Sequence, residues 1–385
     1  MKILIYVDNL ERLKFFLKIT VHINNDIIFM TNKFSIYIKI NKKYKTYLVK
    51  HSKDKLNYSE IIPDNLSTLA GYQNKTQATL IFNDLYLYLD NLYKKEMFNE
   101  VFIWNGGTTF AYTLKEFCKE KSIKTLFFEI SNFHRKIFVD INGVNARSYL
   151  YNHIEILDSM EIDENKFNSW LEEYKSNKSK LLKQAKNKSL IRIEMLIDYF
   201  GYFFFSVIRE DFRNPLIVIK DKLLNKFNIV YNKVNLNSSY IFFPMQVSND
   251  SQVILNSDFD NIDVIKELIN KYSNENIYIK IHPAEPNRRF IKKVLEFEKR
   301  YNNIKIVGND TKDLIVNAKK VVVINSTVGL ESLLYEKNLE VYGRAFYSNF
   351  NRHRLIAYIQ KYLINIDYFD NEEVSKKEIQ RILDK

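Results

Sequence analysis

The second half of the chain alternates between short apolar segments and longer segments with amphipathic helical periodicity. The apolar runs "YIFF" and "VVVI" are typical of strands buried on both faces of a sheet. The predicted strands are 239–246, 276–283, 303–308, 320–326 and 339–343, and the predicted helices are 262–273, 288–301, 311–318 and 327–337. The polar segment 247–261 is predicted to be a loop. Strands that alternate with helices indicate a parallel α/β sheet with helices on both faces.

The first half shows the same alternation less regularly. The predicted strands are 2–7, 100–107 and 124–131, and 113–122 is a predicted helix. The β-branched and aromatic residues of 21–60 indicate short strands of the same sheet. From 160 to 232 the pattern is helical. We therefore predict two Rossmann-like α/β domains, at residues 1–160 and 233–350, with a helical connecting region at 161–232 and a helical tail at 351–385.

Composition narrows the class of protein. The 385 residues are 46% hydrophobic, and 58 Lys+Arg against 46 Asp+Glu give a net charge of +12, which suits an acidic partner. Because lysine is spread along the chain, we expect no nucleic acid as a partner. A single cysteine, Cys118, excludes an internal disulfide and a Cys-based zinc site. No apolar run reaches about 18 residues and the N-terminus lacks a signal-peptide core, so we expect a cytoplasmic protein.

Three predicted strands of the second half end in polar residues. These are Gln246 with Asp250, Lys280 with His282 and Pro283, and Asn325 with Ser326 and Thr327. Ligands bind beyond the carboxyl ends of parallel strands, and a helix N-terminus after Ser326 offers N–H groups to an anion. Helix capping by Ser326 and a structural hydrogen bond of His282 are the simpler interpretations of each residue alone. Together they favour a site for a nucleotide phosphate.

The order of these motifs resembles one known family. "YIFFPMQVSNDSQVILNS" (240–257), "IKIHP" (279–283) and "VVVINSTVGLESLLYEKNLEVYGRAFY" (321–347) are similar to successive motifs of the bacterial capsule polysaccharide synthesis family, which includes the KpsS- and KpsC-type β-Kdo transferases. "FFE" (127–129) and "DINGVNARSYL" (140–150) resemble its acidic motif and its Gly-Val-Asn segment. The resemblance covers roughly residues 100–350.

The resemblance implies a GT-B fold, in which two Rossmann-like domains face each other across a cleft and the C-terminal domain binds the nucleotide sugar. It implies a CMP-linked donor, Kdo or a related acidic sugar, transferred with retention of configuration. It assigns the donor phosphate to His282-Pro283 and Ser326-Thr327.

Catalysis in such enzymes can use a carboxylate as the nucleophile. Glu129 matches the first acid of the family's acidic pair, but the second acid is absent, because the sequence continues Ile130-Ser131-Asn132. Asp140, just before the Gly-Val-Asn segment, is the other candidate. Capping of the following turn is the structural alternative for Glu129.

Substrate-binding candidates lie nearby in the first half. Asn105, Gly106 and Gly107 lie where a strand leads into a helix, Arg135 lies in "SNFHRK" (131–136), and Asn145 lies in the Gly-Val-Asn segment. The "SNFHRK" segment could bind a sugar carboxylate or an acceptor phosphate, or form a solvated turn.

We expect neither a metal nor a cofactor. The one Asp-x-Asp, Asp258-Phe259-Asp260, lies in a polar loop before a helix and is predicted to cap that helix. No other cluster of His, Asp and Glu has the spacing of metal ligands.

One further stretch admits two interpretations. From Lys175 to Arg192 the chain has seven basic residues, and the aromatic run "YFGYFFF" (199–205) follows. This stretch is either a surface for anionic lipid or an interdomain helix that buries its aromatic residues in the core, and we favour burial.

The leading hypothesis is a metal-independent GT-B glycosyltransferase of capsule or surface polysaccharide synthesis. Its partners would be a nucleotide-sugar donor, a lipid-linked or polysaccharide acceptor, the inner face of the cytoplasmic membrane and capsule assembly proteins. The alternatives are a GT-B sugar-nucleotide epimerase, which would bind UDP, and a non-catalytic capsule assembly or export protein.

Overall fold

A computed structural model describes residues 2–52, 62–181, 191–212 and 231–385. The chain divides into two compact units: unit 1 comprises Met1–Phe212 and Ile356–Lys385, and unit 2 comprises Arg213–Leu355. The expected connecting region is only partly described, because residues 182–190 and 213–230 lie outside these ranges. Because unit 1 includes Ile356–Lys385, the C-terminal tail belongs to the same unit as the N-terminal sheet.

Unit 1 is built on a six-stranded sheet in the order β3-β2-β1-β4-β5-β6. Its strands are β1 (Lys2–Tyr6), β2 (Asp26–Thr31), β3 (Thr46–Leu48), β4 (Glu100–Trp104), β5 (Lys124–Ile130) and β6 (Ile137–Asp140). Neighbouring strands are parallel except β5 and β6, which are antiparallel. The prediction of short strands within 21–60 is confirmed by β2 and β3.

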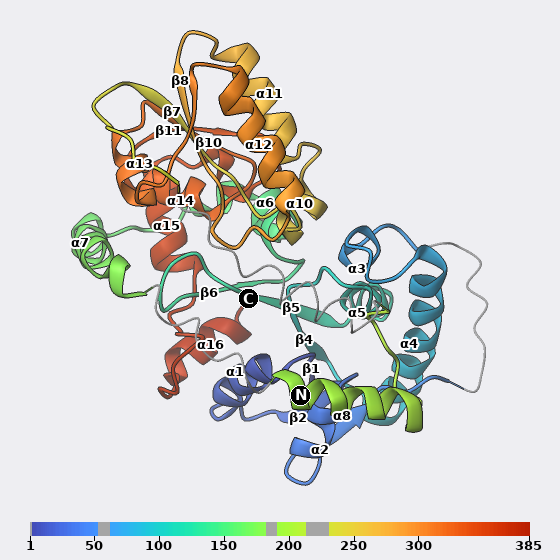
Figure 1. Ribbon diagram of the computed structural model, residues 1–385. Helices are drawn as coiled ribbons and strands as arrows, with labels where there is room; N and C mark the ends of the chain where they lie inside the picture. Colours follow the sequence, from blue (N-terminus) through green and yellow to red (C-terminus); the bar gives the residue numbers. More distant parts are fainter. Residues whose placement is uncertain (1, 53–61, 182–190, 213–230) are drawn as a thin grey trace. The chain divides into compact units, whose positions relative to one another are not determined.

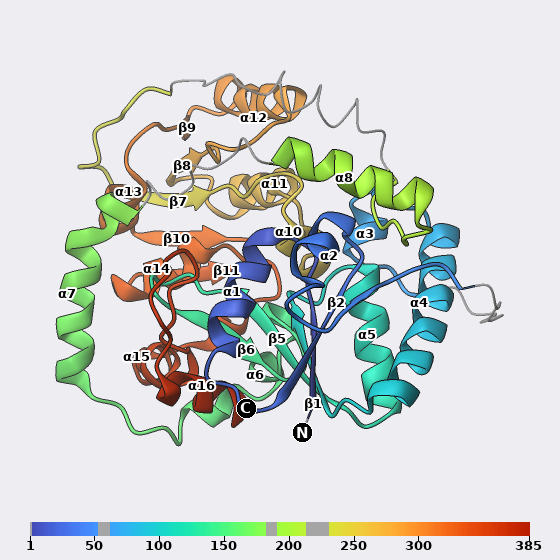
Figure 2. The ribbon, with the colours of Figure 1, turned by 90° about the horizontal axis from the view of Figure 1, so that it is seen from below.

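The helices of unit 1 cover both faces of this sheet. They are α1 (Leu10–Thr20), α2 (Phe34–Ile40), α3 (Leu66–Leu69), α4 (Lys75–Glu96), α5 (Thr109–Glu120), α6 (Tyr149–Asn152), α7 (Glu164–Leu181), α8 (Ile191–Phe204) and α16 (Lys376–Leu383), with α15 (Arg352–Ala357) at the boundary between the units. Helices α1 and α16 lie on one face, and α4 and α5 lie on the other (Figure 2). Asn74 and Gln77 form a capping box that starts α4, a long helix that the sequence pattern did not single out.

The tail completes the core of unit 1. Ile137 at the start of β6 exchanges two backbone hydrogen bonds with Ile364, of 2.9 and 3.0 Å. Ile364, Ile379 and Ile382 of the tail are buried in the same apolar cluster as Phe16 of α1. Burying these side chains favours docking of the tail onto the sheet.

Unit 2 is a parallel five-stranded sheet in the order β11-β10-β7-β8-β9. Its strands are β7 (Tyr240–Pro244), β8 (Asn276–Lys280), β9 (Ile304–Ile306), β10 (Lys320–Val323) and β11 (Asn338–Val341), and its helices are α10 (Ser251–Asn256), α11 (Asn261–Lys271), α12 (Arg288–Arg300), α13 (Thr311–Asn317) and α14 (Thr327–Leu334). Helices α11 and α12 lie on one face of the sheet and α13 and α14 on the other (Figure 1).

Both sheets have a Rossmann-like strand order, and the α/β fold class that the sequence predicts is confirmed. In each, the order reverses beside the first strand, between β1 and β4 and between β7 and β10. One local prediction is wrong: the segment 247–261 contains α10, because Asp250 caps a short helix there by accepting the Gln252 N–H at 2.7 Å.

Candidate active site

The point of strand reversal in unit 2 is closed by a reciprocal side-chain pair. The Gln246 amide donates to Asn325 Oδ1 at 3.0 Å, and its own Oε1 accepts the backbone N–H of Asn325 at 3.1 Å. Asn325 Nδ2 also donates to the carbonyl of Gln252 at 2.8 Å. Gln246 and Asn325, both predicted to bind the donor, therefore hold the ends of β7 and β10 together.

The loops that follow β7 and β8 are joined by Glu285, a residue that the sequence analysis missed. Ser248 donates to the Glu285 carboxylate through its backbone N–H at 2.6 Å and its hydroxyl at 2.8 Å. The backbone N–H of Glu285 donates to the carbonyl of His282 at 2.9 Å. A carboxylate two positions after Pro283 was the signal that could have indicated this link.

His282 is held in a defined tautomer by the same turn. Its Nδ1 lies 3.1 Å from the backbone N of Ala284, which donates to it. The proton of the neutral imidazole is therefore on Nε2, which leaves Nε2–H as the group able to donate to a ligand. Desolvation lowers the pKa of His282 below its usual 6.5, against the opposing effect of Asp250 and Glu285.

The side chains that alternate along β8 and its loop have different surroundings. Tyr278 is buried and stacks on Tyr240 with ring centroids 4.3 Å apart. Lys280 donates to the carbonyl of Asn309 at 2.5 Å, and burial lowers the pKa of its ammonium. His282 and Pro283 are exposed to solvent, whereas Lys280 is half-buried.

Ser326 and Thr327 begin α14. Ser326 is its N-cap and accepts the Val328 N–H at 3.2 Å, while the hydroxyl of Tyr347 donates to the Ser326 carbonyl. Gly329 makes this approach possible, because a Cβ there would lie 2.5 Å from the Tyr347 ring. Thr327 is exposed in the first turn. Capping by Ser326 and an accessible helix N-terminus are thus both present.

In unit 1, Glu129 lies near the end of β5 beside the loop that follows β4. The side-chain amide of Asn105 donates to Glu129 Oε2. Asn105 and Gly106 have φ values of +65° and +85°, and a Cβ on Gly106 would lie 2.9 Å from the ring of Phe127. Glycine is therefore required at Gly106, and the turn aims Asn105 at the carboxylate. The neighbouring Gly107 accepts the Leu66 N–H at 2.9 Å.

Asp140 is buried and saturated with hydrogen bonds. Its carboxylate accepts the N–H groups of Asn142, Gly143, Tyr149 and Leu150, at 2.8, 3.3, 2.8 and 3.1 Å, and the hydroxyl of Tyr362 at 2.6 Å. Asn145, with a φ of +54°, lies in the loop so formed, and its carbonyl accepts the Ser148 hydroxyl at 2.6 Å. The structure thus gives Asp140 and Asn145 parts in holding this loop, and leaves Glu129 as the more accessible carboxylate of the two.

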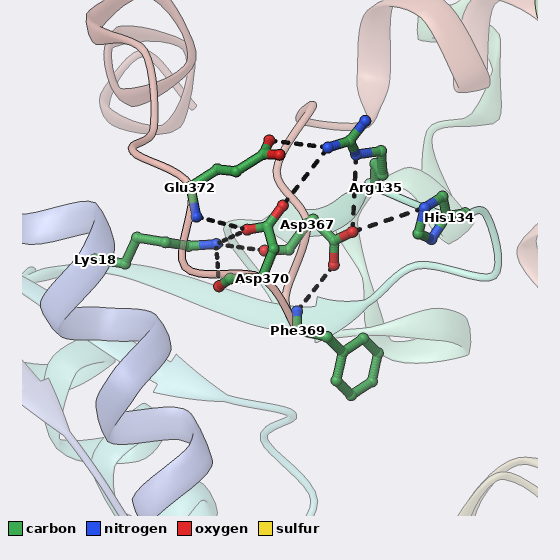
Figure 3. Close-up of polar contacts among 7 residues, drawn as sticks. All are labelled: Lys18, His134, Arg135, Asp367, Phe369, Asp370 and Glu372. Carbon is green, nitrogen blue, oxygen red and sulfur yellow. Dashed lines mark hydrogen bonds and ion pairs between the residues drawn. The ribbon is translucent and has the colours of Figure 1, made fainter. Parts of the chain in front are cut away.

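Arg135 lines a cavity of about 510 Å³ within unit 1, between the 131–136 loop, α7 and the tail. Its guanidinium contacts Glu372 at 2.8 Å and Asp370 and Asp367 at 3.8 Å (Figure 3). His134 lies 3.7 Å from Asp367. Acids of the tail thus contact Arg135 and His134, while Lys136 donates to Asn365 Oδ1 at 2.5 Å, and these internal contacts argue against an external carboxylate as the ligand of Arg135.

Two further groups at the carboxyl edge of this sheet were missed by the sequence analysis. Asp8, after β1, pairs with Arg12, whose guanidinium lies 5.4 Å from the centre of the Trp104 ring. Glu210 accepts the Phe110 N–H at 3.0 Å and so occupies the first turn of α5. Burial raises the pKa of Glu210. An internal carboxylate thus lies where the Gly106-Gly107 turn leads into its helix.

The Asp-x-Asp motif begins a helix, as the sequence analysis predicts. Asp260 caps α11 in a capping box with Asp263, and Asp258 pairs with Arg344 at 2.9 Å. In the described ranges, no group of three or more His, Cys, Asp or Glu side chains is arranged to hold a metal ion. Nor does any helix in those ranges combine the length and the hydropathy of a membrane span.

Two Rossmann-like domains, with polar side chains gathered at the carboxyl ends of their strands, place the chain in the GT-B fold class. The chain belongs to the capsule polysaccharide biosynthesis protein family, whose family model matches residues 133–350. The resemblance that the sequence motifs indicated is confirmed.

Named relatives match over shorter regions. The chain is 34% identical over 124 residues to Protein FixF of Sinorhizobium fredii, and 32% identical over 123 residues to the capsule polysaccharide export protein KpsS of Escherichia coli. These regions cover 31% and 29% of this chain and 30% and 32% of the two relatives. The chain therefore matches about a third of the length of each relative. Among solved structures, the KpsC β-Kdo 2,7 transferase of Thermosulfurimonas dismutans aligns over 100% of this chain and 99% of its own, with 15% identity and a TM-score of 0.48.

Proposed function

We propose that the protein is a glycosyltransferase of capsule polysaccharide synthesis. It would transfer an acidic sugar, Kdo or a relative, from a CMP-linked donor to a lipid-linked or glycan acceptor. The observation that carries the proposal is the convergence of three strand ends in unit 2. Gln246–Asn325 joins the ends of β7 and β10, and Ser248–Glu285 joins the loops after β7 and β8. His282 and Thr327 are exposed on this framework, and both side chains can donate a hydrogen bond to an anion.

The donor phosphate would bind at the start of α14. The N–H groups at the start of the helix and the Thr327 hydroxyl would donate hydrogen bonds to its oxygens, as would Nε2–H of His282. As the sugar leaves, negative charge grows on that phosphate, and these donors stabilise it. In this proposal they take the part that a metal ion has in other transferases, so transfer needs no metal.

Glu129 would be the nucleophile of a retaining double displacement. A carboxylate oxygen attacks the anomeric carbon as the bond to the CMP phosphate breaks, and the electron pair of that bond leaves with CMP. The acceptor hydroxyl then attacks the same carbon, displaces Glu129 and loses its proton to solvent. The hydrogen bond from Asn105 would keep the carboxylate oriented.

A non-catalytic capsule assembly or export protein is the second candidate. The observation that favours it is that one Glu129 oxygen is engaged by Asn105, while the acid that follows Glu129 in the related transferases is Ile130 here. Such a protein would keep its function in Glu129→Gln. An epimerase, the third possibility, would bind UDP and turn over a free nucleotide sugar without an acceptor.

Calorimetry with CMP, UDP, GDP and ADP in the presence of EDTA tests the proposal. We expect selective CMP binding that weakens at least tenfold in His282→Ala and is unchanged in His153→Ala, an exposed histidine of unit 1. Selective binding of UDP would contradict the CMP donor and favour the epimerase. Binding of none of the four nucleotides would favour the non-catalytic protein.

A further inference from the structure

Helix α8 has one face anchored to unit 1. Asp198 accepts the Ser35 N–H at the start of α2 at 2.9 Å, and Lys33 donates to the Tyr202 hydroxyl at 3.0 Å. Gly201 packs so closely that a Cβ there would lie 2.4 Å from Cβ of Phe34. Figure 1 shows α8 lying against α2. These contacts fix which side of the helix faces outward.

The outward face is apolar. Its residues are Ile193, Leu196, Phe200, Phe203 and Phe204, with exposed fractions of 62, 71, 48, 77 and 71%. At 100° per residue they fall within an arc of about 100° on the side opposite Asp198 and Tyr202. The expectation that "YFGYFFF" is buried in the core is therefore wrong for most of these aromatic side chains. Exposed apolar clusters of this kind mark contact surfaces.

An apolar cavity adjoins this face. It has a volume of about 340 Å³, and the aliphatic and aromatic side chains among its lining residues include Leu80 of α4, Phe203 of α8 and Phe212. Leu80 is itself 60% exposed. The outer face of α8 and this cavity thus form a continuous apolar surface, because Phe203 belongs to both.

Two cationic side chains lie beside aromatic residues next to this surface, and His51, which lines the cavity, pairs with Asp84. Lys50 lies 6.0 Å from the centre of the Phe205 ring, and Arg209 lies 5.5 Å from that of Phe212. On α8, Glu194 is the opposing charge, and Asp198 is turned inward to α2. Cations beside apolar side chains that carry no hydrogen-bonding group match anionic headgroups above an acyl layer.

We propose that α8 docks unit 1 onto an anionic phospholipid surface by inserting its outer face into the headgroup–acyl boundary. At 14 residues the helix is too short to span a bilayer, so it would lie in the plane of the interface. Leu80 and the adjoining cavity would lie next to the acyl chains. This docking does not depend on the chain transferring a sugar.

Co-sedimentation of the full chain with vesicles tests this proposal. We expect binding to vesicles of phosphatidylglycerol and phosphatidylcholine, and at least about tenfold weaker binding to phosphatidylcholine alone. The double variant Phe203→Ser/Phe204→Ser should lose at least about tenfold in partitioning to the anionic vesicles. Phe369→Ser/Val316→Ser, which alters two apolar residues exposed elsewhere, should bind like the wild type.

A second measurement keeps the test independent of folding. In Phe203→Trp, tryptophan emission should shift to shorter wavelength on addition of anionic vesicles and be quenched by brominated acyl chains, while thermal unfolding shows the variant to be folded. A wild-type chain that stays in the supernatant, or equal binding by both double variants, would overturn the proposal. Self-association without vesicles that Phe203→Ser/Phe204→Ser abolishes would also overturn it and identify a second copy as the occupant.

Discussion

Gln246 and Asn325 exchange a donor and an acceptor across the point where the strand order of unit 2 reverses. Gln246 is buried, so a change that removes both hydrogen bonds leaves polar groups of Asn325 unpaired. Gln246→Leu should lower the stability of unit 2 by about 1–3 kcal/mol and weaken nucleotide binding, because the start of α14 is no longer held beside β7. Thermal unfolding and calorimetry measure both effects. Gln380→Leu, at an exposed position, is the control, and an unchanged melting temperature in Gln246→Leu would contradict the structural role.

Asp140→Asn separates a structural carboxylate from a catalytic one. The amide turns one acceptor oxygen into a donor that faces the N–H groups now bound to the carboxylate, at a cost of about 3 kcal/mol. For a unit of this size the melting temperature should fall by roughly 5–10 °C. If Asp140→Asn melts like the wild type but is inactive, Asp140 is catalytic and the structural assignment fails.

Glu129→Gln should abolish activity and leave stability unchanged. The amide can still accept a hydrogen bond from Asn105 through its oxygen, so stability and nucleotide affinity should stay close to those of the wild type. Release of CMP from CMP-Kdo in the presence of acceptor should fall at least about 1,000-fold, because the amide is a poor nucleophile. Wild-type rates in Glu129→Gln would remove Glu129 from the mechanism.

Nucleotide binding should couple to protonation of His282. Its pKa is lowered by desolvation, so the imidazole of the free protein is neutral at pH 7. A bound phosphate favours the imidazolium and raises that pKa, at the cost of the hydrogen bond that Nδ1 accepts from Ala284. Protons are then taken up at pH values between the free and bound pKa, and affinity falls as the pH rises through that range. Calorimetry in two buffers of different ionisation enthalpy measures the uptake. His282→Gln removes the imidazole but keeps the titration of the nucleotide phosphate, so the difference in proton uptake between the two proteins belongs to His282. Equal proton uptake by variant and wild type would refute the coupling.

Glu96 should determine part of the acid stability of unit 1. Burial opposes its ionisation, but hydrogen bonds from Lys2, Lys45 and Tyr47 lower its pKa from 4.5 to about 2. A lowered carboxyl pKa stabilises the fold above the unfolded value, and this stabilisation, up to about 3 kcal/mol, is lost as the pH falls from about 4.5 to 2.

Melting temperatures across that pH range test the role of Glu96. Glu96→Gln should melt lower at pH 7 and show a flatter acid dependence than the wild type. Glu336→Gln, at an exposed ion pair with Arg352, should change neither. A parallel acid dependence in Glu96→Gln and the wild type would show that other groups determine the acid stability.

The alternation of apolar and amphipathic segments determined the architecture of both sheets and the places where chemistry gathers. Strands such as Tyr240–Pro244 are apolar because helices cover both of their faces, and this is local information. The caps of α11 and α14, at Asp260 and Ser326, follow from side chains that reach N–H groups two or three residues away. Motifs of that range can be read from the sequence alone.

Only the tertiary structure decided which of those side chains bind each other and which remain accessible. Gln246 meets Asn325 across 79 residues and Asp140 meets Tyr362 across 222, and no local pattern specifies such partners. The sequence shows that a side chain at a strand end is polar, but it does not show whether that side chain binds a ligand or another loop. The aromatic run of α8 is likewise compatible with core or surface, because hydrophobicity states a preference for burial and only packing decides which face is covered.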